Sequence, residues 1–511
     1  MQYVLGNMLN GGGINPDGLS LDLQFAADKT LTARRGPTPV FSRASSGTFV
    51  NANKIIVGKT AGTTSSITPS TQAISSQVTV TVASGSVVGW VVGQAISLIV
   101  DTDGQDDPDA TELWLLGNIV SSTDTTLVFT VTSRTAQAGS ATSWTLGYRG
   151  PRFDHDPVTG ACKGLLIEEG RTNLQTNSQT FASWSTTDLT VAASVINDPM
   201  GQLARILTEG SAAASSHRVF QDITATSGTT YSVSYYVKAG TRTWCGIVGQ
   251  GAAFTAAAYF NLATGALGSG SGAGYVNHLI QPLLNGWYRV TLVATAQATG
   301  AASLSLRLTT GDNTPTHNGD GVSFLYASMA QLEAGSFPTS YIPTTTGSVV
   351  RSADVCNITG GDFNNFYNQS EGTLFAECQT PSANQYAGIA VIGTTSFNHN
   401  IALFKSDTTG GTVGNRFVPY VTQGGTLMAI HDFGNESGNG NLKVLASVAL
   451  NNMIFARNGT LSPLDSTAAM PTPNRITIGG RADGNYINGH IAAIRYFKKR
   501  LPNAKLVTLT T

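Results

Sequence analysis

Acidic side chains, a histidine and a thiol gather in one short segment of this 511-residue chain. The segment is PRFDHDPVTGACKGLLIEEGRTNL, residues 151–174, and its reactive side chains are Asp154, His155, Asp156, Cys162, Glu168 and Glu169. Such side chains can bind a metal ion or transfer protons, but a zinc site would need further His or Cys residues at a matched spacing. Aspartates before a proline also bond nearby backbone N–H groups and form turns. We favour the turn, with local ion pairs around Glu168–Arg171, and keep a cation site and catalysis as alternatives.

Carboxylates elsewhere in the chain do not form a recognisable catalytic pair. Hydrolysis of a glycosidic bond needs two carboxyl groups about 5–10 Å apart across a cleft. The acids of the C-terminal region are scattered; they are Glu371, Glu377, Asp407, Asp432 and Glu436. A GxSxG motif and a phosphate-binding loop are also absent from the sequence. We therefore predict no catalytic residues and no enzyme activity.

Aromatic residues in the middle of the chain could form a platform for sugar, because ring faces pack on the apolar faces of pyranoses. We take Trp184, Trp244 and Tyr259 as candidate ligand-binding residues, among a wider set that includes Tyr235, Tyr236, Trp287 and Tyr288. Neighbours in a strand face opposite sides, so one of Trp287 and Tyr288 must point inward. We expect Trp287 to lie in the core.

Polar loops near the C-terminus supply a second set of candidates. His399, Asp432 and Asp483, with Asn398 and Asn435, could bind sugar or calcium, although loops rich in such residues are often simply turns. We predict no metal site and no cofactor, and calcium is the one ion left open. The basic run Arg495–Arg500 alternates with aromatics and indicates a solvated strand face, with contact to an anionic polysaccharide as the alternative.

Composition narrows the class of protein. Charged residues make up 12% of the chain, about half the usual share, and the net charge of −1 gives no electrostatic case for nucleic acid or an anionic membrane. No window approaches the ~18 apolar residues of a membrane span, and the N-terminus lacks the features of a signal peptide. We expect synthesis in a cytosol. The four cysteines are far apart and are expected to act as small hydrophobic residues.

Short segments of alternating hydrophobicity, separated by Gly, Ser and Asp turns, predict β-strands along the whole chain, and no sustained helical period is found. The expected fold class is all-β and multidomain, with a small β-barrel or sandwich insert followed by two jelly-roll or lectin-like sandwiches. The expected divisions are an N-terminal anchoring segment at 1–53, an inserted β domain at 57–149, a continuation of the leader at 150–174, a jelly roll at 175–345, a linker at 346–355 and a sandwich at 356–511.

Two separated stretches resemble one leader pattern of tailed-phage and prophage structural proteins. They are LDLQFAADKTLTARRGPTPVFSRASSGTFV, within residues 20–53, and PRFDHDPVTG with GLLIEEGRTNL, within residues 150–175, where Arg152, Phe153, Asp154, Asp156, Pro157, Gly164, Leu165 and the residues from Glu168 to Leu174 match. His155 replaces the usual aromatic residue. The middle region resembles carbohydrate-binding modules through YFNLATG, NGWYRVTLVATA and AQLEAGSFPTSYIPTTT, and the last region is similar to concanavalin A-like, or laminin G-like, sandwiches.

The resemblance implies a phage virion protein of the fibre or spike type. It would attach to other virion proteins through its N-terminus, bind host-surface polysaccharide through its sandwiches and reside in the virion. Residues 1–53 hold few apolar positions, so an ordered N-terminus implies a partner surface, and we expect a homo-oligomer. That this oligomer is a trimer is implied by the resemblance to phage fibres alone. The alternatives are a capsid or tail decoration protein with a purely structural role and a polysaccharide depolymerase.

Overall fold

Nearly all regular secondary structure of the protein is β, which confirms the predicted all-β, multidomain fold class. The structure is a computed structural model that describes residues 17–82, 87, 90, 92, 94–100, 113–123, 125–380, 386–396, 398–409, 412–435 and 441–511. The chain divides into two compact units. The first comprises the described residues of Met1–Ser42, Cys162–Glu169 and Asp354–Thr511, and the second comprises those of Arg43–Ala161 and Gly170–Ala353.

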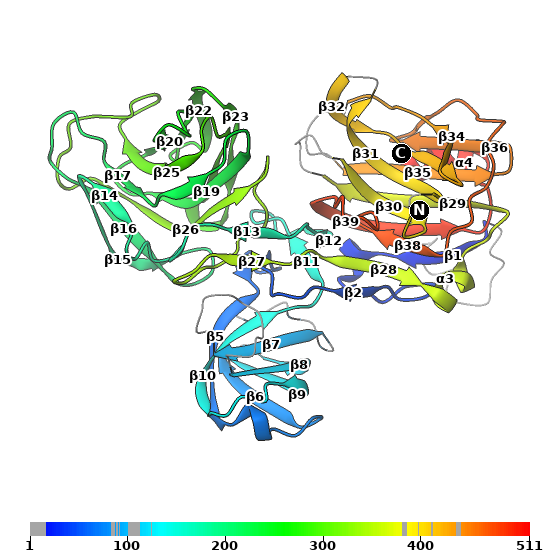
Figure 1. The fold of residues 1–511 in the computed structure, drawn as a ribbon, viewed down its shortest axis with the longest axis horizontal. Coiled ribbons are helices and arrows are strands. Elements are labelled where there is room, and N and C mark those ends of the chain that lie inside the picture. The colour runs from blue at the N-terminus through cyan, green and yellow to red at the C-terminus, as the bar shows by residue number, and fades with distance from the viewer. Residues whose placement is uncertain are drawn as a thin grey trace. The chain divides into compact units, whose positions relative to one another are not determined.

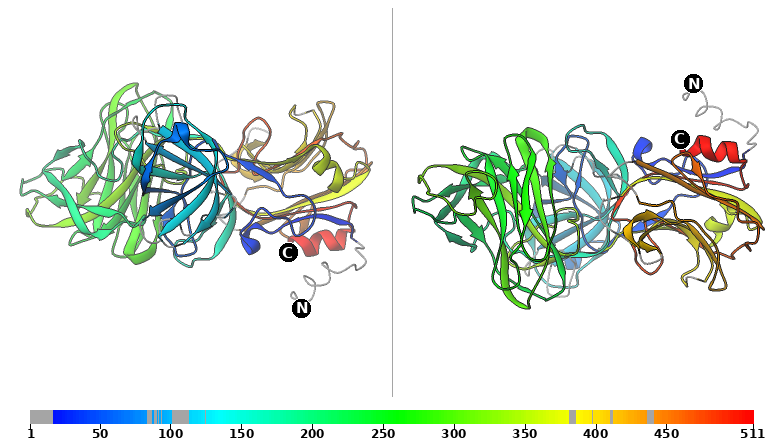
Figure 2. Two further views of the ribbon diagram at one scale, coloured as in Figure 1. Left: turned by 90° about the horizontal axis from the view of Figure 1, so that it is seen from below. Right: turned by 90° about the horizontal axis from the view of Figure 1, so that it is seen from above.

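Six antiparallel strands of the second unit close a small barrel (Figure 2). Alternation of buried valines with exposed polar residues, as in QVTVTV at 77–82, gives each strand one face for the barrel interior. Val80, Leu98 and Leu127 are fully buried there. Around the barrel the strands are β10 (Ala141–Tyr148), β5 (Lys59–Ile67), β6 (Gln77–Val82), β9 (Thr126–Arg134), β8 (Leu113–Ser122) and β7 (Ala95–Val100), with a 3-10 turn at Pro69–Thr71.

A two-sheet jelly roll makes up the rest of the second unit, with a core of residues such as Val233, Ile247 and Leu306 between the sheets. The β25 sheet runs β14 (Ser185–Thr187), β17 (Arg218–Phe220), β25 (Gly300–Thr309), β20 (Trp244–Gln250), β21 (Ala257–Asn261) and β22 (Ala266–Ser271), with β18 (Ile223–Ala225) also on β25. The β19 sheet runs β15 (Leu189–Asn197), β16 (Leu203–Glu209), β26 (Phe324–Ala334), β19 (Thr230–Ala239), β24 (Trp287–Thr295) and β23 (Tyr275–Pro282).

The outer face of the β19 sheet is covered by other parts of the same unit. Trp287 and Tyr236 pack there with Ile56 and Tyr341, so Trp287 is buried, as expected, although on the outer side of its sheet. Tyr288 packs against the core between the sheets. The covering segments contain β3 (Phe49–Val50) with β4 (Ile56–Val57), β13 (Arg171–Asn173) with β27 (Val349–Arg351), β11 (Arg152–His155) and a 3-10 turn at Leu284–Gly286 beside β24.

Two further sheets form a sandwich in the first unit (Figure 1). One runs β12 (Cys162–Ile167), β39 (Gly489–Phe497), β29 (Glu371–Gln379), β35 (Asn441–Ala449), β36 (Asn452–Arg457) and β37 (Thr460–Leu461), with β1 (Leu19–Leu23) also on β39. The other runs β2 (Val40–Ser42), β28 (Val355–Thr359), β38 (Arg475–Ile478), β30 (Ala387–Gly393), β31 (Asn400–Thr409), β33 (Tyr420–Gln423) and β34 (Thr426–Ile430), with β32 (Thr412–Phe417) on β31. The helices are α2 (Phe25–Asp28), α3 (Gly360–Phe366) and α4 (Asn503–Thr510), and no helix among the described residues is long and apolar enough to cross a membrane.

The N-terminal segment finds its partner surface within its own chain. β1 pairs antiparallel with β39, and Leu21, Leu23 and Phe25 are fully buried in the first unit. The described residues before Ser42 are therefore part of a sandwich core, and their order needs no sister chain or particle. This removes the physical argument for a trimer from residues 17–42, while residues 1–16 of the expected anchoring segment lie outside the described residues.

The start of the first barrel strand and the end of the last lie side by side, which predicts that the barrel folds independently of the rest of the chain. Lys59 on β5 and Gly147 on β10 are paired residues, and Tyr148 N donates to the Gly58 carbonyl oxygen at 2.7 Å. Paired Cα atoms lie about 4.5–5.5 Å apart, which three glycines span. Replacing residues 59–147 by Gly-Gly-Gly should leave the jelly roll and the sandwich folded, with thermal transitions within a few degrees of those of the full chain by calorimetry.

A partial deletion serves as the control, because it distinguishes removal of the complete barrel from the loss of some of its residues. Removing only residues 59–82 leaves four barrel strands without two neighbours, and exposed strand edges favour aggregation. That variant should aggregate while the complete excision stays soluble. Loss of both remaining transitions in the complete excision would show that the barrel is required for the rest of the second unit.

Candidate functional site

The polar side chains of residues 151–174 bond the backbone of their own unit. Asp156 Oδ1 accepts hydrogen bonds from Val158 N at 3.0 Å and Thr159 N at 2.7 Å, which forms the predicted turn. Asp154 Oδ1 accepts from Val50 N at 2.6 Å, and His155 Nδ1 lies 3.1 Å from the Val50 carbonyl oxygen. Among the described residues no group of three His, Cys, Asp or Glu could hold a metal ion.

The later residues of the same segment are also structural. The amide of the buried Asn173 donates to the carbonyl oxygens of Ala330 and Ile342 and accepts from the N–H groups of Gln175 and Leu332. In the first unit Gly164 has φ +112°, and a Cβ there would lie 2.1 Å from the Ile491 carbonyl oxygen. The residues of this segment therefore have structural roles in holding the backbone in place. A functional site must be sought elsewhere in the protein.

Two of the three aromatic candidates are buried. Trp184 is 8% exposed in the jelly-roll core, where Nε1 donates to the Thr176 carbonyl oxygen at 2.7 Å and the ring meets Phe181 edge-on. The structure therefore places Trp184 as a core residue, contrary to its expected role as a sugar platform. Tyr259 is 1% exposed and points away from that core, on the outer face of the β25 sheet. Trp244 lies on the same outer face and is partly exposed.

The candidates in the first unit belong to separate local clusters. Asp432 accepts from Arg416 Nε at 2.8 Å, and Asp483 forms an ion pair with Arg481 at 2.6 Å. Burial opposes the ionisation of both carboxyls, but the hydrogen bonds from their arginines outweigh it and hold each pKa below its ordinary value. A carboxylate neutralised by arginine is a poor calcium ligand, so these loops favour the turn interpretation. His399 Nδ1 accepts from the hydroxyl of Thr472 at 3.2 Å.

Strand geometry shows whether two of the carboxylates in the first unit could form the catalytic pair of a glycosidase. Glu371 and Glu377 lie on one strand, β29, six residues apart. At ~3.3 Å per residue their backbones are about 20 Å apart, beyond the ~5–10 Å of a hydrolytic pair. Glu436 and the side chain of Asp407 lie outside the described residues.

Register brings two arginines and an aromatic ring into one row on the outer face of the β25 sheet. Arg218 on β17 pairs with Arg307 on β25, Arg307 pairs with Gly246 on β20, and Gly246 pairs with Tyr259 on β21. A Cβ on Gly246 would lie 3.0 Å from the ring of Tyr259, so the missing side chain makes room for that ring. Sequence reasoning identified Tyr259, the aromatic residue of this row, but missed both arginines, because only the register makes them neighbours.

Arg307 is buried without a carboxylate. It is 5% exposed, its Nε donates to Ser305 Oγ at 3.3 Å, and its Nη1 donates to the Pro315 carbonyl oxygen at 3.1 Å. Burial, and then the charge of Arg218, lower the pKa of Arg307 to about 10. The guanidinium remains a cation at neutral pH, held by neutral acceptors alone in the described part of the chain.

Arg218 is the exposed member of the pair. Its Nε donates to Thr187 Oγ1 at 3.1 Å, and its guanidinium lies 4.7 Å from the centre of the Phe220 ring. Burial lowers the pKa of Arg218, and the charge of the solvent-exposed Asp222 opposes this effect. The face therefore presents a cation and the ring of Trp244 toward solvent, with Arg307 between them.

Unsatisfied hydroxyls lie on the same face. Ser303 Oγ and Thr309 Oγ1, both outward-facing on β25, are buried without a hydrogen-bond partner in the described residues. Buried polar groups normally have partners, so each such hydroxyl calls for an explanation. Together with Arg218, Arg307, Tyr259 and Trp244 they define what we call the arginine face.

The loop over the arginine face, residues 310–322, is anchored by one buried carboxylate. Glu209 accepts a bidentate hydrogen bond from Arg242, and it also accepts from His317 Nε2 at 3.1 Å and from Asp320 N at 3.1 Å. The ring of His317 in turn lies 4.3 Å from that of His217. Because this loop carries Pro315, whose carbonyl oxygen bonds Arg307, Glu209 positions one side of the face.

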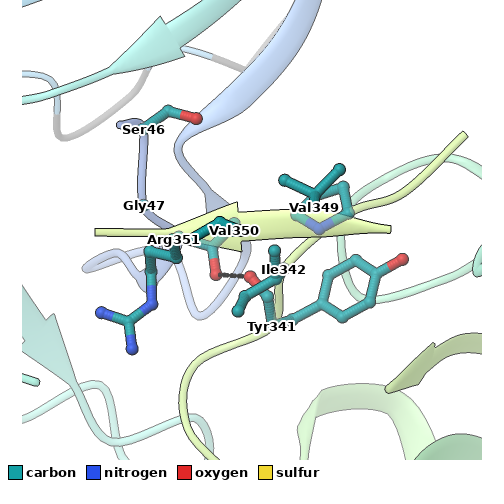
Figure 3. A pocket seen from close by; sticks show the side chains of 9 residues that line it. Ser46, Gly47, Tyr341, Ile342, Val349, Val350 and Arg351 are labelled. Carbon is teal, nitrogen blue, oxygen red and sulfur yellow. Dashed lines mark hydrogen bonds between the residues drawn. The ribbon is translucent and has the colours of Figure 1, made fainter. Parts of the chain in front are cut away.

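The hollows of the structure are less suited to a ligand. One in the second unit, shown in Figure 3 between Tyr341–Ile342 and Val349–Arg351, holds about 10 Å³, enough for a single water at most. Another, in the first unit, has about 310 Å³ and is lined by Ile430, His431, Phe455 and residues 462–467. Its Asp465 carboxylate already bonds Thr467, so few polar groups converge on its interior.

The anchoring role of Glu209 predicts a pH dependence. Burial opposes ionisation of Glu209, but the hydrogen bonds from Arg242 and His317 and from the Asp320 N–H outweigh it, so its pKa in the folded protein lies below the ordinary value of 4.5. The unfolded chain then binds protons first on acidification. This stabilisation is complete above pH ~4.5 and is lost as pH falls through the folded pKa.

Glu209→Gln tests this expectation by urea unfolding at several pH values. The free energy of unfolding at pH 7 should fall by about 2 kcal/mol, because Arg242 loses its counter-ion but is partly exposed. The gap between wild type and variant should narrow below pH ~4.5. Asp28→Asn, which breaks the exposed pair with Arg34, should change the free energy by less than ~0.5 kcal/mol. A gap that stays constant down to pH 2.5 would contradict the assignment.

Comparisons with known proteins give no family. No protein-family model matches the chain, and no curated protein matches it. Among solved structures the chain is similar to Trypanosoma rangeli sialidase in complex with the inhibitor DANA, at 9% identity over 96% of each chain with a TM-score of 0.22. Trypanosoma rangeli sialidase itself matches at 9% identity over 97% of this chain and 99% of that one, with a TM-score of 0.21. Similarities of this size establish neither a shared fold nor a shared activity.

Proposed function

We propose that this chain is a tailed-phage virion protein of the fibre or spike type that binds host-surface glycan through the arginine face. The observation that carries the binding proposal is the partly exposed Trp244 on the same sheet face as the partly exposed Arg218. The virion assignment rests on the leader pattern within residues 20–53 and 150–175 and on the resemblance of the middle region to carbohydrate-binding modules.

The chemistry of the face suits a saccharide. A sugar presents an apolar ring face, which packs on an indole, and a rim of hydroxyls, which exchange hydrogen bonds with guanidinium and hydroxyl groups. Trp244 supplies the first kind of contact, while the guanidinium of the partly exposed Arg218 supplies the second. The opposite outer face, that of the β19 sheet, is covered by Ile56 and Tyr341 and offers no comparable surface.

The two alternative functions use the same fold differently. A decoration protein would need no exposed ligand-binding groups, and the partly exposed Trp244 and Arg218 on one sheet face favour a ligand-binding role instead. A depolymerase would need a pair of carboxylates, and Glu371 and Glu377 are too far apart along β29 to form one. We therefore propose a non-enzymatic binding protein.

Glycan binding is tested first with the intact protein on a glycan array, and then by calorimetry with the best glycan. Trp244→Ala should weaken binding about tenfold, because stacking on an aromatic ring contributes roughly 1.5 kcal/mol. Tyr386→Ala, which removes an aromatic ring that is 47% exposed in the other unit, is the matched control and should bind like wild type. An array without binding, or equal binding by the Trp244 variant, would refute the proposed site.

Oligomerisation through the N-terminus remains part of the proposal. Residues 17–42 belong to the sandwich, and residues 1–16 are the remaining part of the expected anchoring segment on which contact with sister chains or other virion proteins can be tested. Light scattering should give a trimer for the full chain and a monomer after deletion of residues 1–16. A full-length monomer would argue against the trimer and leave virion attachment as the role of that segment.

A further inference from the structure

We propose that the Arg218–Arg307 pair makes the arginine face selective for anionic saccharides, those that carry a carboxylate or a phosphate group. This inference rests on the proposed function, because it names the class of glycan that the same face binds. It is carried by the placement of two adjacent cations, one of them buried, against neutral partners only.

Three other partly buried arginines of the protein pair with a carboxylate, whereas Arg289, 9% exposed, is held by the hydroxyl of Ser234. Arg242 pairs with Glu209, Arg416 with Asp432, and Arg481 with Asp483. Burying a charge is costly unless an opposite charge compensates for it. In the described residues no carboxylate lies within ion-pair distance of Arg307 or Arg218. What distinguishes the Arg218–Arg307 pair is that two guanidinium groups are adjacent while neither has a carboxylate partner in the described part of the chain, so their charges repel.

The donors that remain at the pair are available to a ligand. Nε and Nη1 of Arg307 bond protein acceptors, whereas its Nη2 has no acceptor in the described residues and is not among the fully enclosed unpartnered atoms. Arg218 uses only Nε, on Thr187 Oγ1. The two free edges lie on neighbouring strands, about 4.8 Å apart in the sheet. An oxyanion between them would accept from both, relieve their mutual repulsion and supply the missing counter-charge.

Guanidinium chemistry limits what that group can be. The planar fork of arginine matches carboxylate and phosphate oxygens, whereas a neutral hydroxyl brings no charge to offset the burial. The nearest other carboxylates are Asp222, beside Arg218, and Asp312, which accepts from Ser269 N at 2.7 Å. Both are exposed and lie at the margins of the row, so they do not fill the position between the arginines.

The arrangement of the face also sets the direction of a bound chain. Arg218 and Tyr259 are three strands apart, which is about 14 Å across the sheet. Trp244 lies two residues along β20 from Gly246 and so belongs to the next row. An oligosaccharide crossing the strands could therefore place its anionic group at the arginines and an adjacent sugar ring on the indole.

The test compares glycans that differ only in charge, using the full chain. The probes are polygalacturonate against the same polymer after reduction of its carboxyl groups, and glucose 6-phosphate against glucose, each followed by calorimetry. We expect at least tenfold tighter binding of one or both anionic probes than of the neutral counterpart. The pair that shows the difference identifies the anion as carboxylate or phosphate.

Three variants assign the effect to the arginines. Arg218→Gln and Arg307→Lys should each weaken binding of the anionic probe about tenfold, the loss of one charge-assisted hydrogen bond. Both should weaken binding of the neutral counterpart less, so that the preference for the anionic probe falls. Lys238→Gln removes the same charge from the β19 sheet and should change neither. Arg307→Lys keeps the positive charge at the buried position, so this variant is expected to fold, and it removes only the planar fork of donors.

The outcomes separate this inference from the proposed function. Equal binding of charged and neutral probes, with loss of both in Trp244→Ala, would overturn the anion selectivity and leave glycan binding intact. Selective binding that survives both arginine substitutions would also overturn it. If no probe and no arrayed glycan binds, the proposed function itself fails, and the inference fails with it.

Discussion

The pairing of β39 with strands from the far end of the chain is the contact on which the architecture depends. Leu21 lies opposite Tyr496, and Leu165 lies opposite Ile491, along the same strand edge. Without β39 the apolar side chains of β1 and β12 have no surface on which to be buried. Because β39 spans Gly489–Phe497, this sandwich cannot close before the chain has been synthesised through that strand. Pairings so distant in sequence are slow to form and leave strand edges open meanwhile.

The same pairing explains why the barrel and the jelly roll are insertions. The chain leaves the first unit after Ser42, returns for Cys162–Glu169 and leaves again until Asp354. Near the points where the chain passes from one unit to the other, particular residues allow two backbone segments to be held close together. Asn173 does this by hydrogen bonds in one unit, and Gly164 by its missing side chain in the other. The acids and histidine of residues 151–174 gather there because polar fasteners are needed where irregular backbone is buried. Their proximity in sequence reflects structure and requires no reactive site.

Strands and fold class could be predicted from the sequence because alternation is a local signal, as the buried and exposed positions of β6 show. The pairing partner of each strand could not be predicted, because no feature of LSLDL at residues 19–23 indicates that this strand pairs with β39. The candidate site shows the same division. Trp244 and Tyr259 were identified from residue type. Trp184 was wrongly predicted to bind a ligand, because hydrophobic periodicity does not reveal that its indole N–H donates to the Thr176 carbonyl oxygen. Arg218 and Arg307 were missed because only register makes them neighbours.

Because charged residues are scarce in this chain, each charge without a nearby opposite charge contributes more to the recognition of a ligand. With 12% charged residues and a net charge of −1, the protein has no extended field with which to attract an acidic polymer from a distance. Discrimination at the arginine face must act after contact, over the few ångströms between guanidinium and oxyanion. Salt screens the exposed Arg218 more than the buried Arg307, because a Debye length of ~8 Å applies to solvent and hardly to the interior. Burial of Arg307, costly in the unliganded protein, is therefore what would keep such recognition effective at physiological ionic strength.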